Sequence, residues 1–294
     1  MESMTDRTSS FAVILAAALS LSACRGTPPP APKQYELRGQ ILSLRPDVGE
    51  VQIKHEAIPD YMGAMTMSFG VKDPTLLQGR APGDLVRGTL MVTDTDAWLS
   101  TLEKTGTAPL PAAAPETSAP APVVDLLEPG QPVPDEGFVD QNGRPWRPGT
   151  LAGKAYALTF IYTRCPLPTY CPLMNRNFRT AQQLVAARGA QADRVRFVTV
   201  SFDPEFDTPA VLKEHAAAIG ADPRTWTFLT GDRAAIEAFA GRFGVSVMRE
   251  PDTTITHNLR TAIVGPTGTI ARIYSGNEWT PAELVAALEA AAAR

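Results

Sequence analysis

The chain has 294 residues, which corresponds to two domains at the usual size of about 100–200 residues each. Its 27 basic and 31 acidic residues give a formal net charge of −4, so it is a poor counterion for phosphate and we expect no nucleic-acid partner. Three cysteines are too few for a disulfide-rich secreted scaffold, whereas 27 prolines predict an extended linker or tail.

The N-terminus has the features of an export signal. Arg7 precedes an apolar run over residues 11–19, which is too short for a membrane-spanning helix but has the size of a signal-peptide core. The run ends in Leu-Ser-Ala-Cys at 21–24, which resembles the lipobox of bacterial lipoproteins. This resemblance implies lipidation of Cys24 and a membrane-anchored lipoprotein on the periplasmic or extracytoplasmic side. An ordinary signal peptide cut near Ala23 is the alternative, and either one exports the chain.

Composition divides the chain into further segments. An Ala/Pro-rich stretch cannot build a core and separates two modules that can. The predicted segments are a signal peptide at 1–24, a tether at 25–34, a first module at 35–104, a linker at 105–123 and a second module at 124–294.

The first module has the alternation of apolar and polar residues that is typical of β-strands. Alternating segments begin at Tyr35, Val51, Met65, Leu85 and Trp98. Five short strands in so few residues predict a small all-β, OB-like barrel.

The second module alternates buried strands with amphipathic helices, which predicts an α/β sandwich. The predicted strands are 156–162, 195–202, 226–229, 260–264 and 270–274, and the predicted helices are 173–188, 208–218, 234–243 and 281–293. A Gly-Pro-Thr-Gly turn at 265–268 predicts a hairpin between the last two strands.

Two cysteines of this module lie between its first strand and its first helix. Cys165 and Cys171 are separated by five residues, and a position near a helix N-terminus favours the thiolate, which attacks disulfides and binds soft metals. Outside the cytoplasm the pair can also form a lasting disulfide. A purely structural bridge is the alternative, although such a short loop yields little entropic stabilisation.

Four motifs surround these cysteines in the sequence. They are FIYTRCP at 160–166, Cys-Pro at 171–172, SFDPEFDTP at 201–209 and Thr-His at 256–257. In this order they resemble the Sco/SenC family over residues 124–294. The resemblance implies a thioredoxin-like copper protein that helps to assemble the dinuclear copper centre of cytochrome c oxidase. It also implies copper ligation by Cys165, Cys171 and His257. Most members have three residues between the cysteines, and this chain has five.

The chemistry of these residues agrees with the resemblance. Two thiolates and an imidazole suit Cu(I), and Cu(II) is an alternative at this domain. We expect His257 in a loop before the strand at 260–264. Asp203 and Asp207 either fix the ligand loop or make the turn that caps the next helix, and we expect His215 on a helix surface.

The first module carries a cluster of soft donors. Met62, Met65 and Met67 lie within six residues, and the latter two share one strand face, while His55 ends the preceding strand. Thioether and imidazole together suit Cu(I) or Ag(I). The alternative is core filling, since Phe69 lies on the same face.

The motifs HEAIP at 55–59 and AMTMSF at 64–69 resemble the CusF-type copper-binding domain, over residues 35–104. The resemblance implies that His55, Met65 and Met67 ligate copper. CusF has a tryptophan three residues before its first ligand methionine, and here that position is Met62, which we expect to supply a third thioether.

These features favour an exported copper metallochaperone for the cytochrome c oxidase copper centre. Its partners would be the oxidase subunit that carries this centre or another copper recipient, a thiol reductant, and the membrane through the lipid anchor. The alternative is a periplasmic thiol-disulfide oxidoreductase, with Cys165 as nucleophile and Cys171 as resolving thiol. Copper sequestration or sensing without delivery is a third reading.

Overall fold

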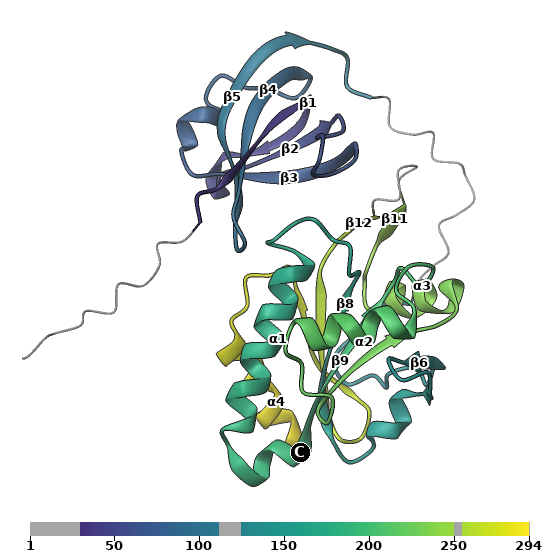
Figure 1. The fold of residues 1–294 in the computed structure, drawn as a ribbon. Coiled ribbons are helices and arrows are strands. Elements are labelled where there is room, and N and C mark those ends of the chain that lie inside the picture. The colour runs from purple at the N-terminus through teal and green to yellow at the C-terminus, as the bar shows by residue number, and fades with distance from the viewer. Residues whose placement is uncertain (1–29, 112–124, 250–254, 294) are drawn as a thin grey trace, which may run out of the picture. The chain divides into compact units, whose positions relative to one another are not determined.

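The computed structural model describes residues 30–111, 125–249 and 255–293. Cys24, the predicted signal peptide and most of the predicted linker lie outside these residues. Two folded domains are described, one on each side of the linker (Figure 1). Across the described ranges, no helix combines the length and the apolar character that crossing a bilayer requires.

The N-terminal domain is a five-stranded sheet that closes on itself in the order β1-β2-β3-β5-β4. Its strands are β1 Lys33–Arg45, β2 Glu50–His55, β3 Met65–Val71, β4 Asp84–Val92 and β5 Ala97–Thr107. All neighbours are antiparallel except β3 and β5. The predicted all-β module is therefore present, and β5 continues three residues past the predicted end of the module at residue 104.

Alternating residues of these strands fill the interior. The buried residues include Leu37 and Ile41 of β1, Val51 and Ile53 of β2, and Leu90 of β4. One glycine allows two strands to approach closely: a Cβ on Gly39 would lie 2.4 Å from the Lys54 carbonyl oxygen. Gly39 pairs with His55, so this close approach sets the position of the last residue of β2.

The C-terminal domain has a seven-stranded sheet in the order β14-β13-β8-β9-β10-β6-β7. Its central strands β8, β9 and β10 are parallel, and the remaining pairs are antiparallel. The strands are β6 Phe138–Asp140, β7 Pro145–Trp146, β8 Ala155–Ile161, β9 Val195–Ser201, β10 Trp226–Thr230, β13 Arg260–Val264 and β14 Ile270–Ser275. A separate two-stranded sheet is made by β11 Val247–Arg249 and β12 Ile255–His257.

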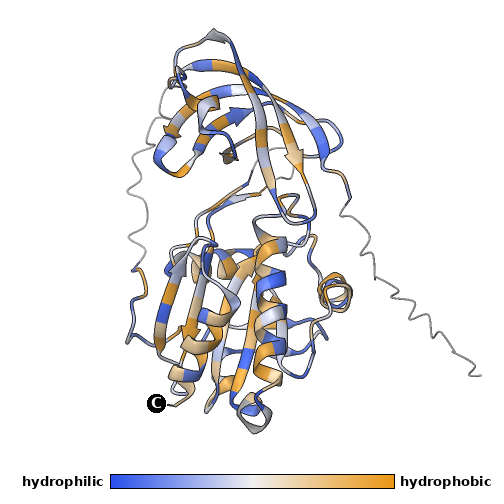
Figure 2. Ribbon diagram, turned by 90° about the vertical axis from the view of Figure 1, so that its left-hand side faces the viewer, coloured by the Kyte–Doolittle hydropathy of each residue, from blue (hydrophilic) through white to orange (hydrophobic). Residues whose placement is uncertain are grey.

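Four helices cover this sheet: α1 Cys171–Ala186, α2 Pro209–Ala218, α3 Arg233–Arg242 and α4 Pro281–Ala292. Phe178 of α1 packs against Phe197 of β9, and Phe239 of α3 packs against Phe160 of β8. Since Ala157 pairs with Phe197 and Phe160 is three residues further along β8, these contacts lie on opposite faces of the sheet. The predicted α/β sandwich is confirmed, with apolar residues concentrated along its central strands (Figure 2).

Most predicted elements of this domain agree with the structure within two residues. The strand at 260–264 and its hairpin turn at 265–268 are as predicted. Four strands were not predicted, namely β6, β7, β11 and β12. Each has only two or three residues, which is too few for an alternation of apolar and polar positions to be recognised.

Candidate metal centres

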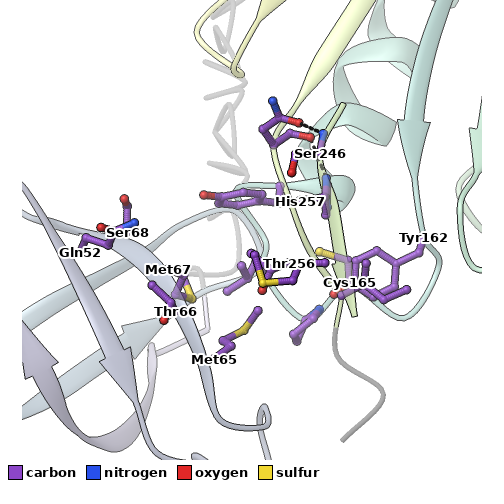
Figure 3. Close-up of a pocket in the computed structure, with 16 residues that line it drawn as sticks. Gln52, Met65, Thr66, Met67, Ser68, Tyr162, Cys165, Ser246, Thr256 and His257 are labelled. Carbon is purple, nitrogen blue, oxygen red and sulfur yellow. Dashed lines mark hydrogen bonds between the residues drawn. The ribbon is translucent and has the colours of Figure 1, made fainter. Parts of the chain in front are cut away.

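Three predicted ligands meet at one end of the C-terminal domain. One donor atom from each of Cys165, Cys171 and His257 lies within 4.8 Å of the other two. Cys171 Sγ is 3.5 Å from His257 Nε2. Both cysteines are free thiols and buried, with 8% and 1% of their surfaces exposed. Figure 3 shows Cys165 and His257 among the side chains drawn from this domain.

Each of these residues comes from a different element. Cys165 lies in the loop that follows β8, Cys171 is the first residue of α1, and His257 is the last residue of β12. The prediction of a loop at His257 was wrong, because residues 255–257 pair with β11. The prediction that this histidine reaches the cysteine loop is confirmed.

The orientation of the His257 ring is determined by its neighbours. Its Nδ1 lies 2.9 Å from the Asn258 carbonyl oxygen, and a carbonyl only accepts, so Nδ1 carries the proton. The other nitrogen, Nε2, is the one that faces Cys171. Three aromatic rings surround the imidazole, with centroid distances of 4.7 Å to Phe202, 5.8 Å to Tyr162 and 6.1 Å to Tyr170.

The folded environment shifts the pKa values of the two thiols in opposite directions. A hydrogen bond from the Cys171 thiol holds the pKa of Cys165 well below its ordinary value. Burial acts in the opposite direction, and the neighbouring His257 lowers this pKa further. Complete burial raises the pKa of Cys171. This direction is opposite to the one expected for a thiol at a helix N-terminus, since burial is the largest influence on Cys171. Cys165 is therefore the more acidic of the two thiols.

Two buried aspartates hold the loop that precedes Cys165. Asp207 Oδ2 accepts a 3.0 Å hydrogen bond from the Thr163 backbone, and its carboxylate also accepts from the Thr163 and Ser201 hydroxyls. Asp203 Oδ2 accepts from Arg164 Nε at 3.0 Å and Nη2 at 2.6 Å. Of the two roles considered for these aspartates, their side chains fix the ligand loop, and Thr208 caps α2.

The five residues between the cysteines are also held. Arg176 of α1 donates to the Pro168 carbonyl at 2.8 Å, and Asn277, beyond β14, donates to the Thr169 carbonyl at 2.7 Å. The Tyr170 amide closes a turn on the Leu167 carbonyl at 3.0 Å. Sequence reasoning did not identify Arg176 or Asn277, because neither belongs to a recognisable motif and both acceptors are backbone oxygens.

The prediction for His215 was wrong. Its ring is partly buried, lies 6.0 Å from Phe228, and contacts Asn175 Nδ2 through Nε2 at 3.0 Å. Burial lowers its pKa. His215 is therefore part of the packing between α1, α2 and β10 rather than a surface residue.

The N-terminal domain brings together a second group of soft donors. His55 and Met65 are direct partners across β2 and β3, so their side chains share the inner face of the sheet. They are 2% and 6% exposed. Met67 lies two residues further along β3 on the same face and is half-buried (Figure 3).

His55 has the same local arrangement as His257. Its Nδ1 lies 2.7 Å from the carbonyl oxygen of the following residue, Glu56, so Nδ1 carries the proton and Nε2 is the ring's acceptor. Its ring packs edge-on against Phe69 at 5.5 Å. Met62 is 7% exposed and its backbone pairs with Ile58 in the turn before β3. Its role as a third thioether ligand stays a prediction.

Both groups fit a soft monovalent ion. The first offers two sulfurs and an imidazole without a carboxylate, and the second offers thioethers and an imidazole. Thiolate and thioether donors select Cu(I), whereas Mg²⁺, Ca²⁺ and Mn²⁺ prefer oxygen donors. In both groups Nδ1 of the histidine is bound to a carbonyl, as is usual for metal-ligating histidines, so Nε2 is the nitrogen with a lone pair for a metal.

Comparison with known proteins agrees with this division of the chain. Residues 134–293 match the family model SCO1/SenC, and residues 34–104 match the model for the copper binding periplasmic protein CusF. The SCO1 protein homolog of Bacillus subtilis (strain 168) is 32% identical over 147 residues, which cover 49% of this chain and 74% of that protein.

Solved structures are similar over the C-terminal domain. BsSco, described as a member of the Sco family of cytochrome c oxidase assembly proteins, is 29% identical with a TM-score of 0.49, over 57% of this chain and 98% of BsSco. Copper-bound ScoI of Bradyrhizobium japonicum is 27% identical with a TM-score of 0.46, over 56% of this chain and 99% of ScoI.

Proposed function

Because the chain belongs to the SCO1/SenC family, we propose that it is an exported copper metallochaperone that delivers copper for the copper centre of cytochrome c oxidase. Cu(I) is its cargo at both groups of donors. The observation that carries the proposal is the convergence of Cys165, Cys171 and His257 within 4.8 Å. A dithiol enzyme does not require an imidazole in contact with its second sulfur.

In this proposal the N-terminal domain is an OB-like, CusF-type capture site. His55, Met65 and Met67 bind Cu(I), and Met62 adds a third thioether. The match of residues 34–104 to a copper-binding family model supports this role. Neutral thioethers bind Cu(I) without deprotonation, so His55 is the only one of these donors for which protons compete with copper when the pH falls.

The two domains then act as a pair joined by the predicted linker. The linker raises the effective concentration of one copper site near the other, which favours transfer within the chain over loss to solution. A lipid on Cys24 would hold both sites at the membrane that contains the oxidase. A thiol reductant is needed, because only the reduced cysteines bind copper.

Copper binding by the reduced full-length protein tests the C-terminal site. Competition with a chromophoric Cu(I) chelator should show a marked loss of affinity in Cys165→Ser, Cys171→Ser and His257→Ala. His215→Ala is the matched control, since it removes a histidine of the same domain outside the ligand group. Equal binding by the wild type and all three ligand variants would contradict the proposal for this domain.

The alternative is a thiol-disulfide oxidoreductase, and the acidity of Cys165 favours it as a second candidate. The Cys165 thiolate would attack a substrate disulfide, and Cys171 would resolve the mixed disulfide. Rapid reduction of a disulfide substrate by metal-free protein, with an external dithiol to regenerate the reduced cysteines and with activity abolished in Cys165→Ser, would support this candidate over copper delivery.

A further inference from the structure

His257 is carried by a hairpin that does not belong to the main sheet. Within the described residues, β11 and β12 pair only with each other, through Val247–His257, Met248–Thr256 and Arg249–Ile255. The backbone ladder of the seven-stranded sheet therefore does not determine where His257 lies relative to the two cysteines. Side-chain contacts must do so.

Arg249 makes the contacts that tie this hairpin to the rest of the domain. It lies two residues from Val247, the direct partner of His257, so Arg249 and His257 share one face of the hairpin. Its guanidinium donates to Glu237 Oε1 of α3, from Nε at 3.1 Å and from Nη2 at 3.0 Å. It also donates to the Phe202 carbonyl and lies 3.8 Å from Asp203 Oδ1.

Phe202 and Asp203 connect Arg249 with both halves of the metal centre. The Phe202 ring contacts the His257 imidazole at 4.7 Å, while its carbonyl accepts from Arg249. Asp203 is 3% exposed, and its other oxygen, Oδ2, binds Arg164, the residue immediately before Cys165. The buried Asp203 carboxylate thus lies between Arg164, next to Cys165, and Arg249 of the hairpin that carries His257.

We propose that Arg249 is a positioning residue that sets His257 in register with Cys165 and Cys171. The inference rests on the proposed copper-binding function and adds the element that controls its histidine ligand. A flat guanidinium can serve the Glu237 carboxylate, the Phe202 carbonyl and Asp203 together, which a shorter or uncharged side chain cannot. Among the polar contacts described for this hairpin, the others include its own short ladder and the bonds of Asn258 to Ser246 and Gly244.

The effect should be a loss of the histidine ligand with retention of both sulfurs. Substitutions of residues that orient metal ligands typically lower metal affinity by about 10–100-fold, and we expect this range for Arg249→Gln. Arg249→Lys keeps one charge for Asp203 but cannot form the forked contacts, so its affinity should be intermediate. If Arg249→Gln does not fold, Arg249→Lys can be measured in its place.

A double-mutant cycle with His257 separates positioning from general destabilisation. Cu(I) affinity is measured by chelator competition for the reduced full-length wild type, Arg249→Gln, His257→Ala and the double variant. If Arg249 acts through His257, Arg249→Gln weakens binding in the wild-type background and has no further effect in the His257→Ala background. Arg233→Gln is the matched control, because it breaks an exposed arginine–glutamate pair, Arg233–Glu205, of the same domain.

Three results overturn the inference. Equal weakening by Arg249→Gln in both backgrounds would mean that Arg249 supports the fold rather than His257, and an unchanged affinity in the folded variant would mean that His257 needs no such support. If His257→Ala itself leaves the affinity unchanged, the proposed ligand set is wrong and the role of Arg249 is rejected with it. The first two results leave the proposed function intact.

Discussion

Asn277 donates a hydrogen bond from its side-chain amide to the Thr169 carbonyl oxygen at 2.7 Å, across 108 positions of the chain. Thr169 lies in the five-residue loop between the cysteines. A loop of this length has more conformations available than a shorter one, so an anchor near its centre restricts the positions of both sulfurs.

Removal of this anchor should affect the metal site more than the fold. We expect Asn277→Ala to lower the free energy of unfolding by about 1 kcal/mol, the usual value of a partly buried hydrogen bond. The Cu(I) affinity of the site formed by Cys165, Cys171 and His257 should fall by about tenfold. Chemical denaturation and chelator competition measure the two effects, with Asn142→Ala in an exposed turn as control. A fall in stability without a change in affinity would show that this loop needs no anchor.

Asp207 should be the more important residue for stability. Its fully buried carboxylate accepts from the Thr163 backbone and from the Thr163 and Ser201 hydroxyls. Asp207→Ala leaves these donors without an acceptor, and we expect a loss of about 2–4 kcal/mol in the free energy of unfolding. Asp222→Ala, which removes a carboxylate bound to exposed Arg224, is the comparison. Equal losses in urea unfolding would contradict the role of Asp207.

The acidity of Cys165 predicts how stability depends on pH. The pKa of Cys165 in the folded protein lies below its ordinary value of 9.0. At a pH between the folded pKa and 9.0, this thiol is therefore protonated more often in the unfolded chain than in the folded protein. The free energy of unfolding of the reduced, metal-free protein should therefore rise with pH up to 9.0, and the contribution is lost as the pH falls through the folded pKa. The raised pKa of Cys171 has the opposite sign and lowers stability above 9.0.

Urea unfolding at several pH values between about 6 and 9 measures this slope. Cys165→Ser should flatten it, whereas Cys171→Ala removes the donor of the stabilising hydrogen bond and should move the rise to higher pH. Alkylation by iodoacetamide gives an independent readout, with Cys165 modified before Cys171. A slope that persists unchanged in Cys165→Ser would have another origin.

Conservative changes in the N-terminal domain should separate ligation from core filling. In a full-length Cys165→Ser/Cys171→Ser background, Met65→Leu and Met67→Leu should abolish most Cu(I) binding because leucine has no sulfur. Each should cost less than about 1.5 kcal/mol of stability, since the volumes are similar. Met91→Leu is the matched control, from a half-buried position on β4 of the same domain. If all three variants bind copper equally, the methionines of β3 are core residues only.

The sequence was sufficient for the features that local patterns encode. The predicted strand at 156–162 is apolar except for Thr159 and agrees with the buried strand Ala155–Ile161, and Thr208-Pro209 starts a helix as an N-cap followed by proline usually does. The position of His257 near the cysteines was predicted from the family motifs, since nothing local to residue 257 indicates a partner 86 positions away.

The contacts that position the ligands of the metal centre could not be predicted from the sequence. Arg249 belongs to a three-residue strand, and two of its acceptors, the Phe202 carbonyl and Glu237 Oε1, lie on separate elements. The acidity of the cysteines was also out of reach, because it depends on whether burial or the helix dipole prevails. Complete burial of Cys171 decides that balance, and only the folded chain reveals it.

His55 and His257 each bond the main-chain oxygen of the residue that follows them. An acceptor of this kind is present whatever amino acid occupies position 56 or 258, so no single codon change there deletes it. The tautomer of both imidazoles therefore does not depend on the side chains at positions 56 and 258. Position 56, where the glutamate side chain is exposed, is accordingly a suitable place for a spectroscopic label beside the histidine.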